Sequence, residues 1–97
     1  METPEPMQPN WCVYLILCRN GSLYCGISNR PAERLSAHRQ GKGAKYTRTH
    51  PPLAMRIVSD GMDKSTALKR EAEVKKLATD KKRDLWAAAE ANEIKAV

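Results

Sequence analysis

The chain has 97 residues, of which 41% are hydrophobic and only 5% aromatic, so it has room for one domain with a modest, mainly aliphatic core. Its 17 Lys and Arg outnumber 11 Asp and Glu, and the net charge of +6 at pH 7 favours polyanionic partners, although basic charge also serves solubility alone. No apolar run approaches the roughly 18 residues of a membrane helix and there is no secretory leader pattern, so we expect a cytoplasmic protein without a membrane partner.

The three cysteines, Cys12, Cys18 and Cys25, lie inside apolar runs. Their number is odd, and they form no C-x-x-C pair and have no neighbouring histidine, which argues against both a disulfide framework and a zinc site. We therefore expect reduced thiols in the core.

The domain boundaries follow from composition. Residues 1 to 10 hold three prolines and no apolar periodicity, which predicts a disordered N-terminal tail. Residues 11 to 92 are predicted to form a single domain and residues 93 to 97 a C-terminal tail. The expected fold class is α/β, of the α+β kind: a small three-stranded, mainly antiparallel sheet flanked by helices, in the order strand, strand, helix, strand, helix, helix.

Two strands are predicted first. Residues 11 to 17 read WCVYLIL and are apolar on both faces, which is typical of a central strand buried on both sides. After turn-forming residues, residues 22 to 27 predict a second strand, so the pair forms a β-hairpin.

The turn of this hairpin sets the register, and two turns fit the sequence. A two-residue turn at Asn20-Gly21 places Tyr14 and Tyr24 on opposite faces. A three-residue loop from Arg19 to Gly21, with the glycine in a left-handed bulge, places both tyrosines on one face. If the two tyrosines act together, the bulged loop is required.

A helix is predicted to begin at Pro31 and to end at Gly41. Arg34 and His38 are four residues apart, so they share one face of this helix. Its packing side is supplied by Ala32 and Leu35.

Residues 41 to 49, GKGAKYTRT, form a basic segment hinged by glycines. Between positions 30 and 48 there are six basic residues against one acid, Glu33. Such a run is often only a solvated face, yet glycines between basic residues also let a chain approach phosphates closely. The sequence leaves both interpretations open.

Further along, the pattern predicts one strand and two helices, at residues 53 to 59, 64 to 78 and 80 to 91. Asp60-Gly61 is expected to stop the strand, and Asp63 to cap the first of these helices. Leu85 and Trp86 are expected to point inward from the second.

Glu71 falls inside an apolar helical stripe, which consists of Ala67, Leu68, Val74 and Ala78. Because a lone buried carboxylate is costly, this acid needs a partner. One candidate is an ion pair with Lys75 or with an arginine on a strand. The other is a hard divalent cation, which oxygen ligands suit.

Taken in order, these residues resemble the GIY-YIG nuclease family. The two motifs are Cys12-Val13-Tyr14 and Tyr24-Cys25-Gly26, followed by Arg34, His38 and Glu71. The resemblance spans about Trp11 to Leu85 and is closest to small standalone bacterial members with an H-x-x-G-K-G-A-K-Y-T-R type of segment, here residues 38 to 48. Each motif alone is weak, but the ordered set is specific.

Departures from the family pattern are few. Cys12 replaces the glycine of the first motif and Cys25 the isoleucine of the second, both at structural positions. A downstream asparagine of some relatives has no match, since Asn92 comes too late. The resemblance thus implies one ion, Mg²⁺ or Mn²⁺, held by Glu71 and completed by water and phosphate.

What the resemblance implies is a metal-dependent phosphodiesterase that cuts DNA by in-line attack of water. Tyr14 would be the general base, which requires nearby cationic charge, and Tyr24 would contact the phosphate or the water. Arg34 would stabilise developing charge, His38 would orient Tyr14 or the water, and Glu71 would hold the metal. Gly26, opposite Tyr14, would leave room for the substrate backbone. The nucleic-acid-binding set comprises Gly26, Arg30, Lys42, Lys45, Tyr46 and Arg48.

The function predicted is therefore an endonuclease without strong sequence specificity, acting in DNA repair, recombination or processing. We expect single-stranded or branched DNA to be preferred over plain duplex, because the sequence has no DNA-reading module, and Tyr46 or Trp11 to offer a stacking surface. We also expect a monomer without an organic cofactor. The alternatives are a non-catalytic basic DNA- or RNA-binding module and a protein-interaction domain with an idle site.

Overall fold

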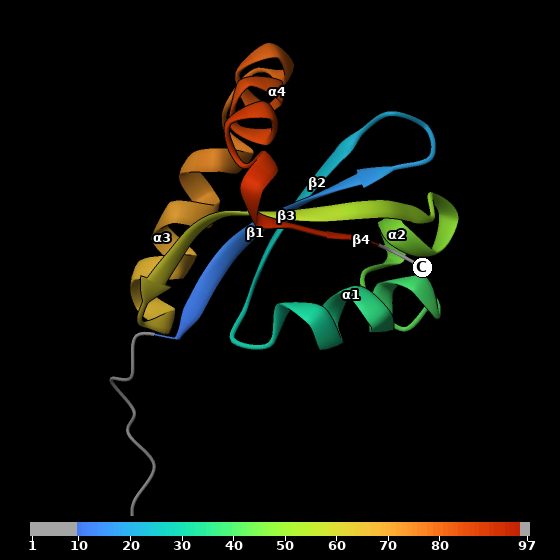
Figure 1. Cartoon of the computed structure of the whole chain (residues 1–97), viewed down its shortest axis with the longest axis horizontal. Helices are drawn as coiled ribbons and strands as arrows, with labels where there is room; N and C mark the ends of the chain where they lie inside the picture. Colours follow the sequence, from blue (N-terminus) through green and yellow to red (C-terminus); the bar gives the residue numbers. More distant parts are fainter. Residues whose placement is uncertain (1–9, 96–97) are drawn as a thin grey trace, which may run out of the picture.

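The computed structural model describes residues 10 to 95, so most of the predicted N-terminal tail and the last two residues of the predicted C-terminal tail lie outside the described residues. Within this range, no helix is both long enough and apolar enough to cross a bilayer. The elements, in chain order, are β1 (Trp11–Cys18), β2 (Leu23–Ser28), α1 (Pro31–Arg39), α2 (Lys45–Thr49), β3 (Pro52–Met62), α3 (Lys64–Lys75), α4 (Thr79–Ala88), the 3₁₀ turn η1 (Glu90–Asn92) and β4 (Glu93–Lys95) (Figure 1).

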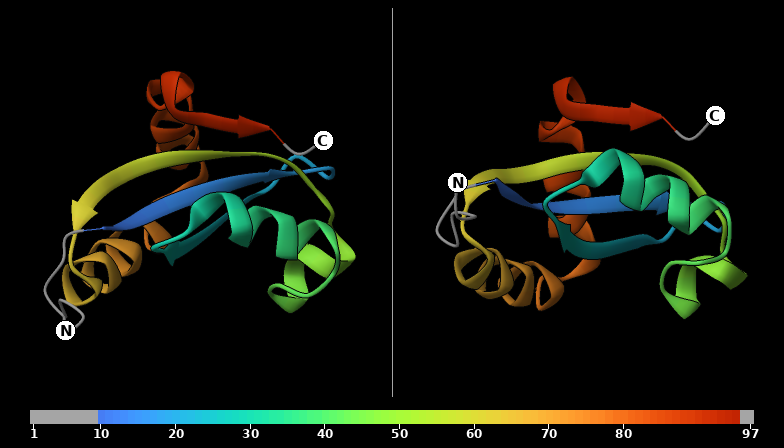
Figure 2. Two further views of the ribbon diagram at one scale, coloured as in Figure 1. Left: turned by 60° about the horizontal axis from the view of Figure 1, so that its bottom comes forward. Right: turned by 90° about the horizontal axis from the view of Figure 1, so that it is seen from below.

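The sheet has the order β2-β1-β3-β4, and every neighbouring pair is antiparallel. The predicted mixed fold with an antiparallel sheet flanked by helices is confirmed, but the prediction of three strands was wrong. Residues 93 to 95, assigned to a tail, form a fourth strand that pairs with β3. Figure 2 shows β1, in blue, running between β2 and β3, with β4 beyond β3.

The fourth strand is held by Arg56. Its Nε donates to Glu93 Oε1 at 2.6 Å, and its Nη1 donates to the carbonyl oxygen of Trp86 at 2.8 Å. The guanidinium also lies over the Trp86 ring, 4.3 Å from its centroid. A strand of three residues is too short to show a periodic pattern in the sequence. Its pairing with β3 depends on this tertiary contact, which the sequence does not reveal.

The core is divided by the sheet into two layers. On one side Val13 and Leu15 of β1 pack against α3, and on the other Tyr14 and Ile16 pack towards α1. Successive β1 residues point to opposite faces, and all of them from position 12 to position 16 are buried, as predicted for a central strand. The three cysteines are also buried and unpaired with one another.

The hairpin turn is the three-residue bulged loop. Tyr14 pairs with Gly26 and Ile16 with Tyr24, so the two tyrosines lie on one face of the sheet. Gly21 has φ +86°, and its N–H donates to the Cys18 carbonyl at 2.9 Å. The left-handed conformation favours glycine, which explains why this position ends the loop.

Helix α1 begins at Pro31 as predicted, and its end turns the chain back towards the sheet. The N–H of Lys42 donates to the Ala37 carbonyl at 2.8 Å, and that of Gly41 donates to the His38 carbonyl at 3.1 Å. This Schellman pattern closes the helix and directs the basic segment over its last turn. Leu35 is buried as expected, whereas Ala32, predicted to pack, is exposed.

Three further boundaries differ from those predicted, and one of them is the end of α4, at Ala88 rather than at residue 91. Strand β3 continues through Asp60-Gly61, because these residues form an irregularity in its pairing with β1 rather than a stop. Asp63 caps α3 as predicted, accepting from the Thr66 N–H at 2.8 Å. This helix ends at Lys75, three residues earlier than predicted.

Candidate active site

All five side chains predicted to act in catalysis line one open cleft of about 370 Å³. They come from four elements, β1, β2, α1 and α3, and are Tyr14, Tyr24, Arg34, His38 and Glu71. Gly26 and Lys42 of the predicted nucleic-acid-binding set line the same cleft. Lys45 and Arg48 lie on α2 and are exposed outside it.

Tyr14 and His38 form the buried floor of this cleft. The Tyr14 hydroxyl lies 3.1 Å from His38 Nε2, and both side chains are almost fully buried. Opposite them is Gly26, where an added Cβ would collide with the Tyr14 hydroxyl. Gly26 therefore makes room for the tyrosine ring itself, whereas the sequence had suggested room for the substrate.

The other nitrogen of His38 also has a partner. Nδ1 lies 2.6 Å from the Thr47 hydroxyl, which donates to the Ala44 carbonyl at 2.9 Å. Thr47 was not among the residues predicted from sequence. It sits in a helix of five residues, too short for a periodic signal, and was grouped with the basic residues around it.

Tyr24 lies between two aromatic neighbours. Its ring is 5.6 Å from that of His38 and stacks on Tyr46 at 6.1 Å with an interplanar angle of 12°. The Tyr46 hydroxyl hydrogen-bonds to Ser22 and accepts from Asn20 Nδ2 at 3.3 Å, which ties α2 to the hairpin loop. The ring predicted to stack on nucleic-acid bases thus already stacks on Tyr24.

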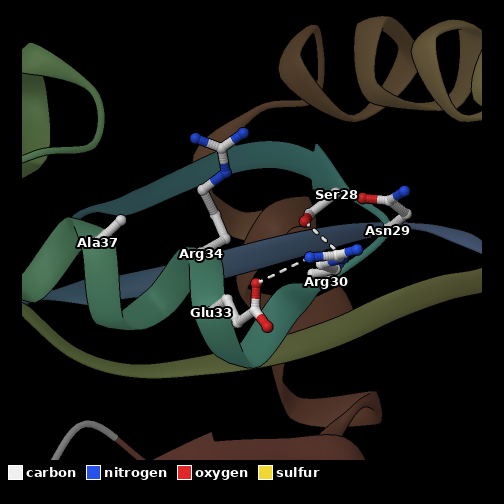
Figure 3. A pocket seen from close by; sticks show the side chains of 6 residues that line it. All are labelled: Ser28, Asn29, Arg30, Glu33, Arg34 and Ala37. Atoms are coloured by element: carbon white, nitrogen blue, oxygen red, sulfur yellow. Dashed lines mark hydrogen bonds and ion pairs between the residues drawn. The ribbon is translucent and has the colours of Figure 1, made fainter.

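A second hollow, of about 220 Å³, adjoins the cleft at Arg34 (Figure 3). Arg34 points away from Arg30, which forms an exposed ion pair with Glu33 at 3.6 Å. An exposed pair of this kind contributes at most about 1 kcal/mol, so Arg30 remains available to an anion.

Glu71 lies at the cleft wall with its side chain 18% exposed, and its Oε2 is 3.2 Å from Lys75 Nζ. The ion pair considered from sequence is therefore present. The apolar stripe around it is narrower than predicted, since Ala67 and Val74 are fully buried but Leu68 is 47% exposed.

The donor set fits a magnesium-like ion. In residues 10 to 95 no three His, Cys, Asp or Glu side chains cluster as a metal cage, and Glu71 is the one carboxylate lining the cleft. Mg²⁺ keeps much of its water and is commonly bound by one or two carboxylates together with substrate phosphates. A cleft with a single carboxylate beside an arginine suits that mode of binding.

The family model described as the GIY-YIG catalytic domain matches residues 10–84, which is most of the chain. The chain belongs to the GIY-YIG family. Members are generally endonucleases, so the fold and the cleft described above are those of a nuclease family.

Among relatives, the chain is similar to small proteins named UPF0213, a name that states no activity. One from Neisseria meningitidis serogroup C is 63% identical over 81 residues, covering 84% of this chain and 89% of the relative. Another from Xanthomonas campestris pv. campestris is 43% identical, covering 80% and 78%, and one from Desulfotalea psychrophila is 38% identical, covering 93% and 83%. No solved structure matches the chain.

In this GIY-YIG cleft, burial governs the ionisation of both floor residues. Burial raises the pKa of the Tyr14 hydroxyl above its ordinary value, and Arg34 offsets this only in part. Burial, followed by the charge of Arg34, lowers the pKa of His38. At neutral pH the protein therefore holds a protonated tyrosine against a neutral histidine, so the cation expected to activate Tyr14 is outweighed by desolvation.

Proposed function

We propose that this chain is a metal-dependent DNA endonuclease that hydrolyses phosphodiester bonds. The observation that carries the proposal is the single cleft in which a buried Tyr14–His38 pair faces both Arg34 and Glu71. A proton-accepting pair, an arginine and a carboxylate are the groups that in-line attack of water on a phosphodiester requires.

The proton acceptor in this proposal is the pair rather than Tyr14 alone. Because the pKa of the phenol is raised, a free phenolate at neutral pH is disfavoured. The attacking water instead donates to the Tyr14 oxygen while the Tyr14 hydroxyl donates to Nε2 of neutral His38. The water proton ends on Tyr14, the Tyr14 proton ends on His38, and the hydroxide oxygen forms the new bond to phosphorus as the bond to the leaving oxygen breaks.

Arg34 and Tyr24 hold the phosphate in this mechanism. The exposed Arg34 guanidinium presents a planar fork that suits two phosphoryl oxygens. Tyr24 lies beside His38, so its hydroxyl serves the phosphate or the attacking water. Glu71 would hold one Mg²⁺ or Mn²⁺, which when bound stabilises charge on the leaving 3′ oxygen.

The substrate that fits best is single-stranded, flapped or branched DNA. Of the basic residues predicted to bind nucleic acid, only Lys42 lines the cleft, and Arg30 lines the adjoining hollow. A surface that neutralises few phosphates binds long duplexes weakly and without sequence specificity. DNA with such structures arises in repair, recombination and processing.

One observation favours the alternative of a binding module that does not cut. Lys75 places an ammonium on Glu71, at the carboxylate where the mechanism requires a metal. If the Lys75–Glu71 pair persists when substrate is bound, no metal occupies Glu71. The cleft then binds a phosphate through cationic side chains such as Arg34 and does not promote cleavage.

A cleavage and binding assay with one set of labelled DNAs separates these functions. Single-stranded, duplex and flapped substrates are incubated with and without Mg²⁺ or Mn²⁺, using the wild type and Tyr14→Phe. The nuclease proposal expects metal-dependent products, most from the flapped or single-stranded DNA, and at least a hundredfold loss of rate in Tyr14→Phe with binding retained. Binding by both proteins without any products in either metal identifies the binding module instead.

A further inference from the structure

The basic segment between α1 and β3 forms one wall of the pocket that holds the His38 ring. At Gly43 an added Cβ would collide with ring atoms of His38, including Nδ1. Four residues on, the Thr47 hydroxyl lies 2.6 Å from the same Nδ1. Gly43 and Thr47, both in the segment GKGAKYTRT, thus contact the imidazole of His38, whether or not the neighbouring lysines contact DNA.

The hydrogen bonds of Thr47 favour one arrangement of protons. A carbonyl oxygen accepts and never donates, so the Thr47 hydroxyl proton points to the Ala44 oxygen, 2.9 Å away. The Thr47 oxygen then offers only lone pairs to His38, and Nδ1 must carry a proton to complete the 2.6 Å contact. In a neutral imidazole the other nitrogen, Nε2, is then an acceptor.

We propose that Thr47 is a positioning residue that holds His38 as the Nδ1–H tautomer, so that Nε2 always faces Tyr14 as a proton acceptor. The result is a chain of one direction: Tyr14 O–H donates to His38 Nε2, Nδ1–H donates to Thr47, and Thr47 O–H donates to the Ala44 carbonyl. The kinetic consequence of this chain rests on the proposed nuclease function, but the tautomer itself does not.

Burial makes the arrangement persistent. His38 is 2% exposed and Thr47 is 1% exposed, so water does not compete for the bond between these two side chains. The opposite tautomer would place two lone pairs, on Nδ1 and on the Thr47 oxygen, against each other at 2.6 Å unless the threonine abandoned Ala44. The Ala44 carbonyl would then keep only the Thr47 N–H, 3.2 Å away, and the loss of its hydroxyl donor favours the first tautomer.

The nature of the Nδ1 partner also matters for the base. A carboxylate there would stabilise the imidazolium, whereas a neutral hydroxyl orients the ring without adding negative charge. The charged or titratable groups facing the ring are Tyr14 from β1, Tyr24 from β2 and Arg34 one turn earlier on α1, with Lys42 and Glu71 elsewhere on the cleft wall. Burial first, and then the positive charge of Arg34, lower the pKa of His38, so the histidine is neutral and able to accept a proton.

The tautomer is tested directly by long-range ¹H–¹⁵N NMR of the histidine rings, with His50→Gln used to assign the His38 signals. We expect the proton on Nδ1 in the wild type and in Thr47→Ser, which keeps a hydroxyl. Thr47→Val has nearly the same shape without the hydroxyl and should shift the population towards Nε2–H. A proton on Nε2 in the wild type overturns the proposal, as does an unchanged tautomer in folded Thr47→Val. Neither result depends on whether the chain cuts DNA.

A kinetic arm applies once cleavage is observed. Thr47→Val should lower kcat by about tenfold or more with little change in KM, and Thr47→Ser should stay within a few fold of the wild type. An Nδ1–H donor is stronger in the imidazolium, so removing its acceptor moves the acidic limb of the pH–rate profile to lower pH. If folded Thr47→Val has the same kcat and the same acidic limb of the pH–rate profile as the wild type, the positioning role is contradicted. If the wild type does not cleave DNA, the proposed nuclease function is contradicted, and the NMR measurement alone decides the tautomer.

Discussion

Gly26 lies directly opposite Tyr14 in the β1–β2 pair, and a Cβ at position 26 would occupy the space of the tyrosine hydroxyl. The strand position is buried, so the ring has little freedom to move aside. The glycine of the second family motif, Gly26, is thus explained by the tyrosine side chain of the first motif, Tyr14.

Replacing Gly26 with alanine should displace the Tyr14 ring from His38. We expect a loss of about 1–3 kcal/mol in the free energy of unfolding and a larger proportional loss of cleavage, because overpacking forces the ring off its position. Chemical denaturation measures the first and a single-turnover assay the second. The matched background is Tyr14→Phe, which lacks the hydroxyl nearest to the new Cβ but keeps the ring carbons beside it. An equal cost of Gly26→Ala in both backgrounds would show that the hydroxyl contact does not determine the cost.

Removing Lys75 should help a divalent ion to bind Glu71. The two charged groups, one helical turn apart, are separated by 3.2 Å. Ion pairs of this type stabilise a helix by about 0.3–0.5 kcal/mol, so we expect Lys75→Ala to lower the Kd for Mn²⁺ roughly twofold. Titration of Mn²⁺ followed by electron paramagnetic resonance measures this without DNA. Lys76→Ala, at the exposed next position, serves as the control, and equal Kd values for the two variants would argue that Lys75 does not compete.

Stability should fall as the pH drops through the range where histidine ordinarily titrates. The folded protein holds His38 with a lowered pKa, so the unfolded chain binds more protons below about pH 6.5 and unfolding becomes easier. Urea unfolding between pH 7.5 and 5.5 should show this slope in the wild type and a shallower one in His38→Gln. The same slope in both proteins would mean that His38 does not contribute to it.

Tyr46 should affect catalysis through Tyr24 more than through DNA affinity. Its ring stacks on Tyr24 and its hydroxyl is bound to the hairpin loop, so Tyr46→Ala releases a group that lines the cleft. We expect a several-fold lower kcat in Tyr46→Ala, whereas Lys45→Ala on the exposed face of α2 should mainly weaken DNA binding. Loss of affinity alone in Tyr46→Ala would favour base stacking instead.

Several features of the fold were accessible from sequence because they depend on neighbours along the chain. The two-sided apolar run of β1, the start of α1 at Pro31 and the Asp63 cap are local patterns of this kind. The hairpin was less determined, since Asn20-Gly21 suits two turns, and only the structure selects the bulged loop.

The remaining features depend on contacts between distant segments. Strand β4 exists because Arg56 joins Glu93 to Trp86, and the role of Thr47 depends on how the segment after α1 folds over His38. The raised pKa of Tyr14 was inaccessible from sequence for the same reason, because burial is a property of the whole fold and outweighs the nearby arginine.

The most direct test of the central claim compares two glutamates on one helix, Glu71 in the cleft and Glu73, which pairs with Arg70 on the exposed side. The measurement is the single-turnover rate of cleavage of labelled flapped DNA in Mg²⁺ by the wild type, Glu71→Gln and Glu73→Gln. The account predicts cleavage by the wild type and by Glu73→Gln at similar rates, and a loss of at least a hundredfold in folded Glu71→Gln that still binds the DNA. Equal rates in all three proteins, or no cleavage by the wild type on any of the DNAs, would contradict it.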